Sequence, residues 1–222
     1  MNDALVAAVR AVDPVGDRAT FDRQWGVLLA ALAGPLPAAM HTWATELADQ
    51  GDALPLLGLS LRGPQYEALL WNGARCPEAA VLITGLLTAP PETTTADLAA
   101  AVAAGVRVNE ALRLLAPPGP ARLSLATIGC AVTAGASSAS ADTIIDLAAS
   151  LMVFGSAVPT GGSRTDLVRA GHPVASGWLA TRLLAAEFAP MAGGLAATLA
   201  AAGGQSTAPV AATVSGLLDA VR

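Results

Sequence analysis

The chain has 222 residues, of which 54% are hydrophobic and 13% are charged, and its formal net charge is −5. It contains 52 alanines and 12 arginines but no lysine, which excludes Schiff-base chemistry on a lysine amine and a Walker-type phosphate loop. Because its 17 acidic residues outnumber the basic ones, nucleic acid is not an expected partner.

The low charge content predicts that part of the apolar surface is covered by another subunit. Charged residues make up about half of the ~25% that is usual in soluble domains. Obligate interfaces resemble a domain core cut in half, so we expect a homodimer. The length fits one domain over residues 1–222.

Neither end of the chain indicates a membrane or export signal. Residues 1–10 lack a basic region followed by an apolar block, so we expect a cytoplasmic protein with reduced thiols at Cys76 and Cys130. Residues 188–218 carry no charge, but Pro190 and Pro209 interrupt them. We expect two short buried helices there, on either side of a turn at 203–204, and no membrane partner.

Alanine and leucine dominate, and alternating strand patterns are nearly absent. This predicts an all-α fold, a compact multi-helix bundle. The first expected helix covers 21–33, with Thr20 as its N-cap. Its expected buried face carries Trp25, Leu28, Leu29 and Leu32.

Similar signals continue along the chain. The apolar run 54–61 is predicted to be extended. The loop 158–172 is the most polar long connection, and loops on a rigid scaffold often hold functional residues. A further predicted helix begins at Pro64 and includes Asn72. The other predicted helices cover 36–50, 77–87, 96–115, 123–137, 141–155 and 173–188, the last with Pro173 in its first turn.

Several segments, taken in order, are similar to motifs of one enzyme family. They are Trp-Gly-Val-Leu-Leu-Ala-Ala-Leu-Ala-Gly at 25–34, Glu-Ala-Leu-Leu-Trp-Asn-Gly-Ala at 67–74, the helix 97–108, the pair 129–135 and 142–152, and the segment 169–188. In the last of these, Gly171, Ser176, Gly177 and Phe188 match the anchors of the family pattern. The chain resembles the MmgE/PrpD family, which includes 2-methylcitrate dehydratase, cis-aconitate decarboxylase and iminodisuccinate epimerase.

The resemblance implies the large helical domain of that family, and it also implies a homodimer. The match places Asp166 where the family has a lysine and Arg169 where it has a histidine. The family's histidine-rich region is reduced to 75–79, and the residues after Phe188 are too few for its lid domain. Ordinary 2-methylcitrate dehydratase activity is therefore not expected.

The expected catalytic residues are His172 and Arg169. His172 is a candidate for proton transfer, or a side chain that hydrogen-bonds at the start of the helix at Pro173. Arg164 and Arg169 can bind a carboxylate or polarise a carbonyl, or they belong to a solvated loop that pairs with Asp166. The expected substrate-binding residues are Arg75, Glu78, Arg164, Asp166, Tyr66, Trp71 and Trp178.

Each of the remaining candidates also has a structural interpretation. The aromatic candidates either line an apolar pocket or anchor the core. Cys76 is a nucleophile only with a base beside it, and Glu78 is a poor base; the other interpretation is a buried, inert thiol. The histidines and cysteines show no metal-ligand spacing, so neither a metal nor another cofactor is expected.

Two functional hypotheses follow. In the first, the chain is an isomerase, lyase or cyclase that positions a small carbonyl-containing or polyketide-like metabolite, with the cleft opened by the missing lid. In the second, it is a non-catalytic homodimeric or heteromeric binding or scaffold protein that has lost the family's active site. Convergence of Arg75, Glu78, Arg169 and His172 on one concave apolar pocket favours the enzyme, and their separation favours the second hypothesis.

Overall fold

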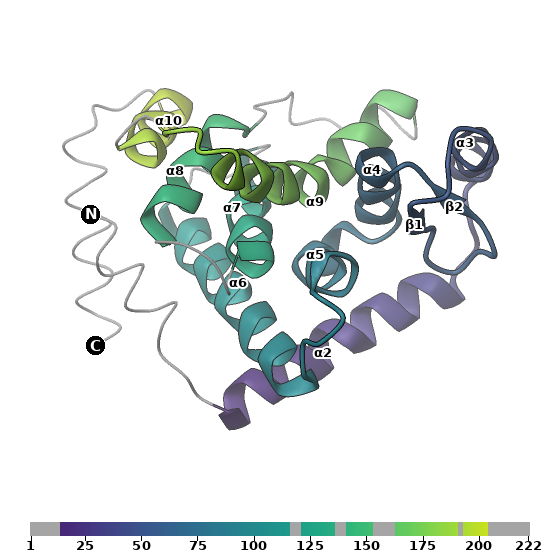
Figure 1. Ribbon diagram of the computed structural model, residues 1–222, viewed down its shortest axis with the longest axis horizontal. Helices are drawn as coiled ribbons and strands as arrows, with labels where there is room; N and C mark the ends of the chain where they lie inside the picture. Colours follow the sequence, from purple (N-terminus) through teal and green to yellow (C-terminus); the bar gives the residue numbers. More distant parts are fainter. Residues whose placement is uncertain (1–13, 116–120, 136–140, 153–162, 191–192, 204–222) are drawn as a thin grey trace.

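Helices make up almost all of the regular structure in the computed structural model, which describes residues 14–115, 121–135, 141–152, 163–190 and 193–203 (Figure 1). The predicted all-α fold is confirmed. The helices are α2 (Pro14–Ala33), α3 (Ala38–Ala48), α4 (Gln65–Arg75), the 3₁₀ helix η1 (Pro77–Ala79), α5 (Ala80–Thr88), α6 (Thr95–Leu115), α7 (Ala121–Gly135), α8 (Ala141–Ser150), α9 (Arg164–Ala185) and α10 (Gly194–Gly203).

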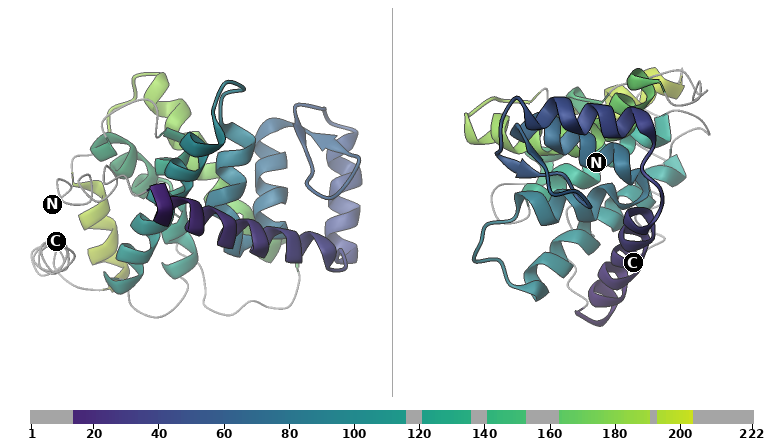
Figure 2. Two further views of the ribbon diagram at one scale, coloured as in Figure 1. Left: turned by 90° about the horizontal axis from the view of Figure 1, so that it is seen from below. Right: turned by 90° about the vertical axis from the view of Figure 1, so that its right-hand side faces the viewer.

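Two hydrophobic clusters form the core. One contains side chains of α2, α3, α4 and α5, and the other contains side chains of α8 and α10. Helices α6, α7 and α9 contribute to both. Figure 1 shows α9 extending from the α3–α4 side of the molecule to the α8–α10 end, so α9 joins the two clusters. Seen from below, α2 lies across α5 and α6 (Figure 2).

Of the run 54–61 that is predicted to be extended, only the first two residues form a strand, and residues 57–60 form the turn of a minimal hairpin. Strand β1 (Leu54–Pro55) pairs antiparallel with β2 (Arg62–Gly63). Asn72 of α4, fully buried, holds the first arm of this hairpin: its Nδ2 donates to the carbonyl oxygens of Pro55 at 2.9 Å and Ala68 at 2.8 Å, and its Oδ1 accepts from the Leu57 amide at 2.7 Å. Asn72 therefore satisfies backbone groups that the short strands leave unpaired.

The first helix corrects the prediction in two respects. It begins at Pro14 rather than after Thr20, and the buried Asp17 in its first turn forms an ion pair with the half-buried Arg107 of α6. Leu28 is buried, but Trp25 is 39% and Leu29 50% exposed, so these side chains do not share one buried face. Packing against α6 turns Asp17 and Phe21 inward instead.

The predicted homodimer stays a prediction.

Helix α9 corrects the prediction of a polar loop before Pro173. The helix begins at Arg164, nine residues earlier, because Ser163 and Asp166 form a capping box: the Asp166 amide donates to Ser163 Oγ, which donates to Asp166 Oδ2 at 2.8 Å. Pro173 lies inside the helix and cannot donate to the Arg169 carbonyl. Burial of Pro173 and its neighbours against α4, α5 and α7 offsets that loss.

The C-terminal prediction is confirmed for its first helix. Leu195 and Leu199 of α10 are buried, and the Asp146 carboxylate of α8 accepts from the amides of Gly193 at 3.0 Å and Leu195 at 3.1 Å. Residues 204–222, which include the second expected helix, lie outside the described residues. Within the described residues no single helix is both long enough and apolar enough to cross a membrane. Among the same residues, only α2 and α3 taken together have the required length and composition, and they are bent by 95° relative to each other.

Candidate functional site

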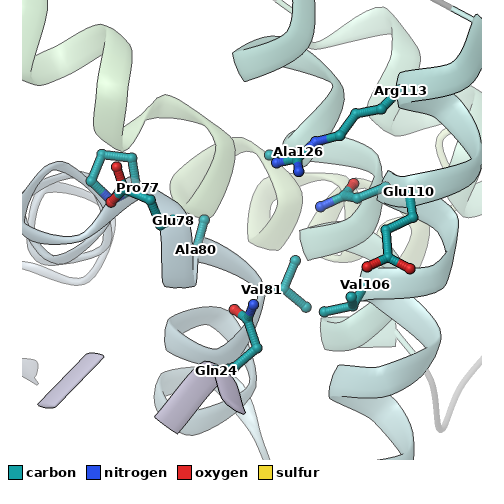
Figure 3. A pocket seen from close by; sticks show the side chains of 10 residues that line it. Gln24, Pro77, Glu78, Ala80, Val81, Val106, Glu110, Arg113 and Ala126 are labelled. Carbon is teal, nitrogen blue, oxygen red and sulfur yellow. The ribbon is translucent and has the colours of Figure 1, made fainter. Parts of the chain in front are cut away.

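A cavity of about 80 Å³ lies where α2, η1, α5, α6 and α7 meet (Figure 3). Its apolar wall comes mainly from α5 and α6, and its polar groups come from three elements. The apolar lining residues are Pro77, Ala80, Val81, Val106 and Ala126, and the polar ones are Gln24, Glu78, Asn109, Glu110 and Arg113.

Helix α6 supplies most of the polar groups because of its periodicity. Val106, Asn109, Glu110 and Arg113 recur at intervals of three and four residues, which places them on one side of an α-helix. Asn109 is 7% exposed, and its Oδ1 accepts from the Gly129 amide of α7 at 3.1 Å. Asn109 therefore joins α6 to α7 at the back of the cavity, and Glu110 and Arg113 lie nearer its exposed rim.

The opposite side of the cavity comes from α2 and η1. Gln24 extends from α2 toward Val81, and Arg113 extends from α6 toward Ala126 (Figure 3). Gln24 Oε1 is buried without a hydrogen-bond partner among the described residues. Leaving a buried acceptor unpaired costs about 1–3 kcal/mol, and a ligand that donates a hydrogen bond removes that cost.

The charged groups of the cavity are available to a ligand. Glu78, Glu110 and Arg113 are exposed. Among the residues that the structure describes, none of the three forms an ion pair or a side-chain hydrogen bond. The site therefore offers two carboxylates, one guanidinium and one amide oxygen to a molecule that enters it.

Of the predicted site residues, Glu78 alone lines this cavity. Arg75 instead donates to the carbonyl oxygens of Gly34 at 2.8 Å, Pro35 at 3.3 Å and Leu32 at 3.4 Å. These carbonyls end α2, so Arg75 acts as a side-chain cap on that helix and joins it to α4.

The predicted aromatic residues contact the core. Trp71 is fully buried, and its Nε1 donates to the Met40 carbonyl at 3.0 Å. Tyr66 and Trp178 are half-buried against the same hydrophobic cluster, and the Arg182 guanidinium lies 6.0 Å from the Trp178 ring centroid. None of the three lines the cavity.

The polar residues of α9 face different neighbours. Arg164 forms an ion pair with Glu46 of α3 at 2.7 Å and lies 6.0 Å from the Trp43 ring centroid. Asp166 is part of the helix cap. Arg169 is exposed, and His172 is half-buried, with Nε2 2.9 Å from Ser176 Oγ.

The segments of Arg75 and Arg169 lie close together, but their charged side chains diverge. Helices α4 and α9 touch at Gly73 and Gly171. Arg169 lies two residues before Gly171, and each residue turns an α-helix by about 100°, so Arg169 points to nearly the opposite side of α9. Among the described residues, Arg75, Arg169 and His172 therefore do not join Glu78 at the cavity.

Burial lowers the pKa of His172 below its ordinary value of 6.5. The folded state therefore binds this proton less well than the unfolded state. The stabilising effect of neutral His172 is complete above about pH 6.5, its ordinary pKa, and is lost as the pH falls below that value and through the lowered pKa of the folded state.

We expect His172→Gln to reduce the loss of unfolding free energy between pH 7.5 and pH 5, measured by urea denaturation. The control is His41→Gln, because His41 is exposed; it should retain the full loss. Equal pH profiles for all three proteins would contradict this role of His172.

The cysteines do not support a nucleophile or a disulfide. Cys76 and Cys130 are both free and buried. Burial raises the pKa of the Cys130 thiol to about 12 and also raises the pKa of Cys76. The described residues contain no group of three histidines, cysteines or carboxylates that could hold a metal ion.

Four polar residues of the cavity are not among the predicted site residues: Gln24, Asn109, Glu110 and Arg113. One signal was present, because Asn109 and Glu110 interrupt a helix made largely of alanine and valine, and Arg113 follows at the spacing of one turn. Gln24 gave no such signal, since its position depends on how α2 crosses α6.

No family model matches the chain, and no curated protein matches it.

Proposed function

We propose that the chain is a non-catalytic binding protein that holds a small polar molecule in the cavity between α2, η1 and α6. The proposal rests on one observation: the four polar residues that an active site would bring together lie apart in the structure. Arg75 caps α2, Arg169 is exposed on α9, His172 pairs with Ser176, and Glu78 lines the cavity.

We also propose that the helices form a scaffold of the MmgE/PrpD type. Packing at the glycines of the similar segments supports this proposal. A Cβ atom at Gly73 would lie 2.8 Å from the Gly171 carbonyl oxygen, and one at Gly177 would lie 2.8 Å from the Ala131 amide. Gly105 and Gly129 meet in the same way between α6 and α7. Phe188 departs from this pattern, with 59% of its surface exposed.

The catalytic hypothesis for Arg169 and His172 stays a prediction. A carbonyl substrate would have to contact both side chains. Ser176, the partner of His172, is only 2% exposed, which leaves little room for a substrate beside that pair. The cavity, by contrast, presents its charged groups to solvent.

A thermal-shift panel tests ligand binding at the cavity. The panel holds small carboxylic acids, amines, polyols and zwitterions, each added to the purified protein. A ligand at a hundredfold excess over its Kd stabilises a protein by about 2.7 kcal/mol, so at least one chemical class should raise the Tm by roughly 5–10 °C.

Ala126→Phe places a large side chain at the cavity wall and should abolish that shift. The matched control is Ala30→Phe, because Ala30 is an exposed alanine of α2; it should respond like the wild type. Absence of any shift in the panel, or an equal shift in Ala126→Phe, would contradict the proposed function.

A further inference from the structure

The charges of the cavity define which small molecules it can hold. We propose that its ligand is a small zwitterion, with a primary ammonium held by Gln24 together with Glu78 or Glu110 and a carboxylate held by Arg113. This inference rests on the proposed function and names the ligand class of the same site.

Three acceptors of the cavity can bind the ammonium end of the ligand. Gln24 Oε1 is buried and has no hydrogen-bond partner among the described residues. Glu78 and Glu110 place two carboxylates around the same cavity, and an ionised carboxylate is purely an acceptor. A primary ammonium has three N–H donors and a positive charge, so it can serve the amide oxygen and a carboxylate at once.

Arg113 can bind the carboxylate end of the ligand. Its side chain extends from α6 toward Ala126, on the α7 side of the cavity (Figure 3). A guanidinium binds a carboxylate through two parallel hydrogen bonds, which also fix its orientation. Arg113 forms no ion pair with Glu78 or Glu110, so its donors are available for a ligand.

The charge balance disfavours a purely anionic ligand. Two carboxylates and one guanidinium give the cavity a net negative charge. A polycarboxylate that binds Arg113 would bring its other negative groups close to Glu78 or Glu110, and like charges repel at that range. A zwitterion places each of its charges beside a group of opposite sign.

The size of the cavity fits a small ligand. One water needs about 10–15 Å³ of such space, and the cavity offers about 80 Å³. This is enough for roughly six non-hydrogen atoms, which is the size of alanine.

Three probes with a shared carbon skeleton test the inference: L-alanine, propionate, which lacks the ammonium, and ethylamine, which lacks the carboxylate. Binding to the full chain is measured by isothermal titration calorimetry at low salt. We expect L-alanine to bind at least tenfold more tightly than either fragment, because each fragment leaves one end of the cavity unpaired.

Variants of the cavity residues test which side chains bind the ammonium and which binds the carboxylate of the ligand. We expect the double variant Glu78→Gln, Glu110→Gln and the single variant Arg113→Gln each to raise the Kd for L-alanine at least tenfold. All three residues are exposed, so the fold should persist, as circular dichroism will verify. The matched controls are Glu92→Gln and Arg23→Gln, because these exposed residues do not line the cavity; both should bind L-alanine like the wild type.

Gln24→Met separates binding from stability. This nearly isosteric change removes a buried acceptor that has no partner in the free protein, so the unliganded variant should unfold at a higher temperature. It should also bind L-alanine more weakly, because the ammonium loses one acceptor. A purely structural role for Gln24 would change the Tm without changing the Kd.

The outcomes distinguish this inference from the proposed function. If propionate binds as tightly as L-alanine, or if only another chemical class of the thermal-shift panel binds at the cavity, the zwitterion is the wrong ligand and the proposed function stands. If no probe and no panel compound binds, both are overturned.

Discussion

Gly171→Ala is expected to lower the free energy of unfolding by about 3 kcal/mol or more, the upper end of the range for overpacked cores. A Cβ atom at this position would collide with the backbone carbonyl of Leu70, where α9 rests on α4. A backbone oxygen in the middle of a helix cannot rotate away as a side chain does. The two helices would have to separate, which would also open the contact between Gly73 and Val174. Urea denaturation at neutral pH measures the change.

Gly26→Ala is the matched control. Gly26 lies in α2, and no atom of a neighbouring element lies within 4 Å of an added Cβ. Alanine there should stabilise the protein by roughly 0.5–1 kcal/mol, because glycine is the poorer helix former. If both substitutions changed stability equally, close packing at Gly171 would not be what holds α4 and α9 together.

Asn72→Asp is expected to destabilise the protein by about 3–5 kcal/mol, the range for an uncompensated buried charge. The side-chain nitrogen of Asn72 donates to the carbonyl oxygens of Pro55 and Ala68. The substitution replaces these two donors with an acceptor of nearly the same shape, and a carboxylate would then face two carbonyl oxygens. Because burial favours the neutral form of a carboxyl group, the loss should be smaller at acidic than at neutral pH.

Gln50→Glu makes the same chemical change at an exposed residue after α3. It should alter the free energy of unfolding by less than about 0.5 kcal/mol. Guanidinium or urea titrations of the two variants, at acidic and neutral pH, give the comparison. An Asn72→Asp protein as stable as Gln50→Glu would show that the hairpin does not depend on the Asn72 amide.

Much of the helical structure could be predicted from the sequence because its signals are local. Prolines and glycines mark the ends of α3, α4 and α6 to within one or two residues, and they act through their own backbone geometry. The predicted start of α9 at Pro173 is wrong, because the helix begins at Arg164. Pro173 at a favourable first-turn position predicts a helix start there, whereas the Ser163–Asp166 cap starts the helix at Arg164.

The candidate site could be predicted only in part. Glu78 was among the expected ligand-binding residues, and the structure places it on the cavity. Gln24, Glu110 and Arg113 come from helices far apart in the chain, so their meeting depends on the crossing of α2 and α6. Arg75 was expected to bind a ligand; the structure turns it toward the end of α2, because the last carbonyl groups of that helix need donors.

The sequence by itself determined the helical class of the protein and the chemistry that it lacks. Composition excluded lysine-based reactions, and the spacing of apolar residues and helix breakers predicted most helices, since these properties belong to single residues and their near neighbours. Only the tertiary structure decided which side chains share a site. The packing of α2 against α6 and η1 places Gln24, Glu78, Glu110 and Arg113 around one cavity, because positions on different helices are related only through packing.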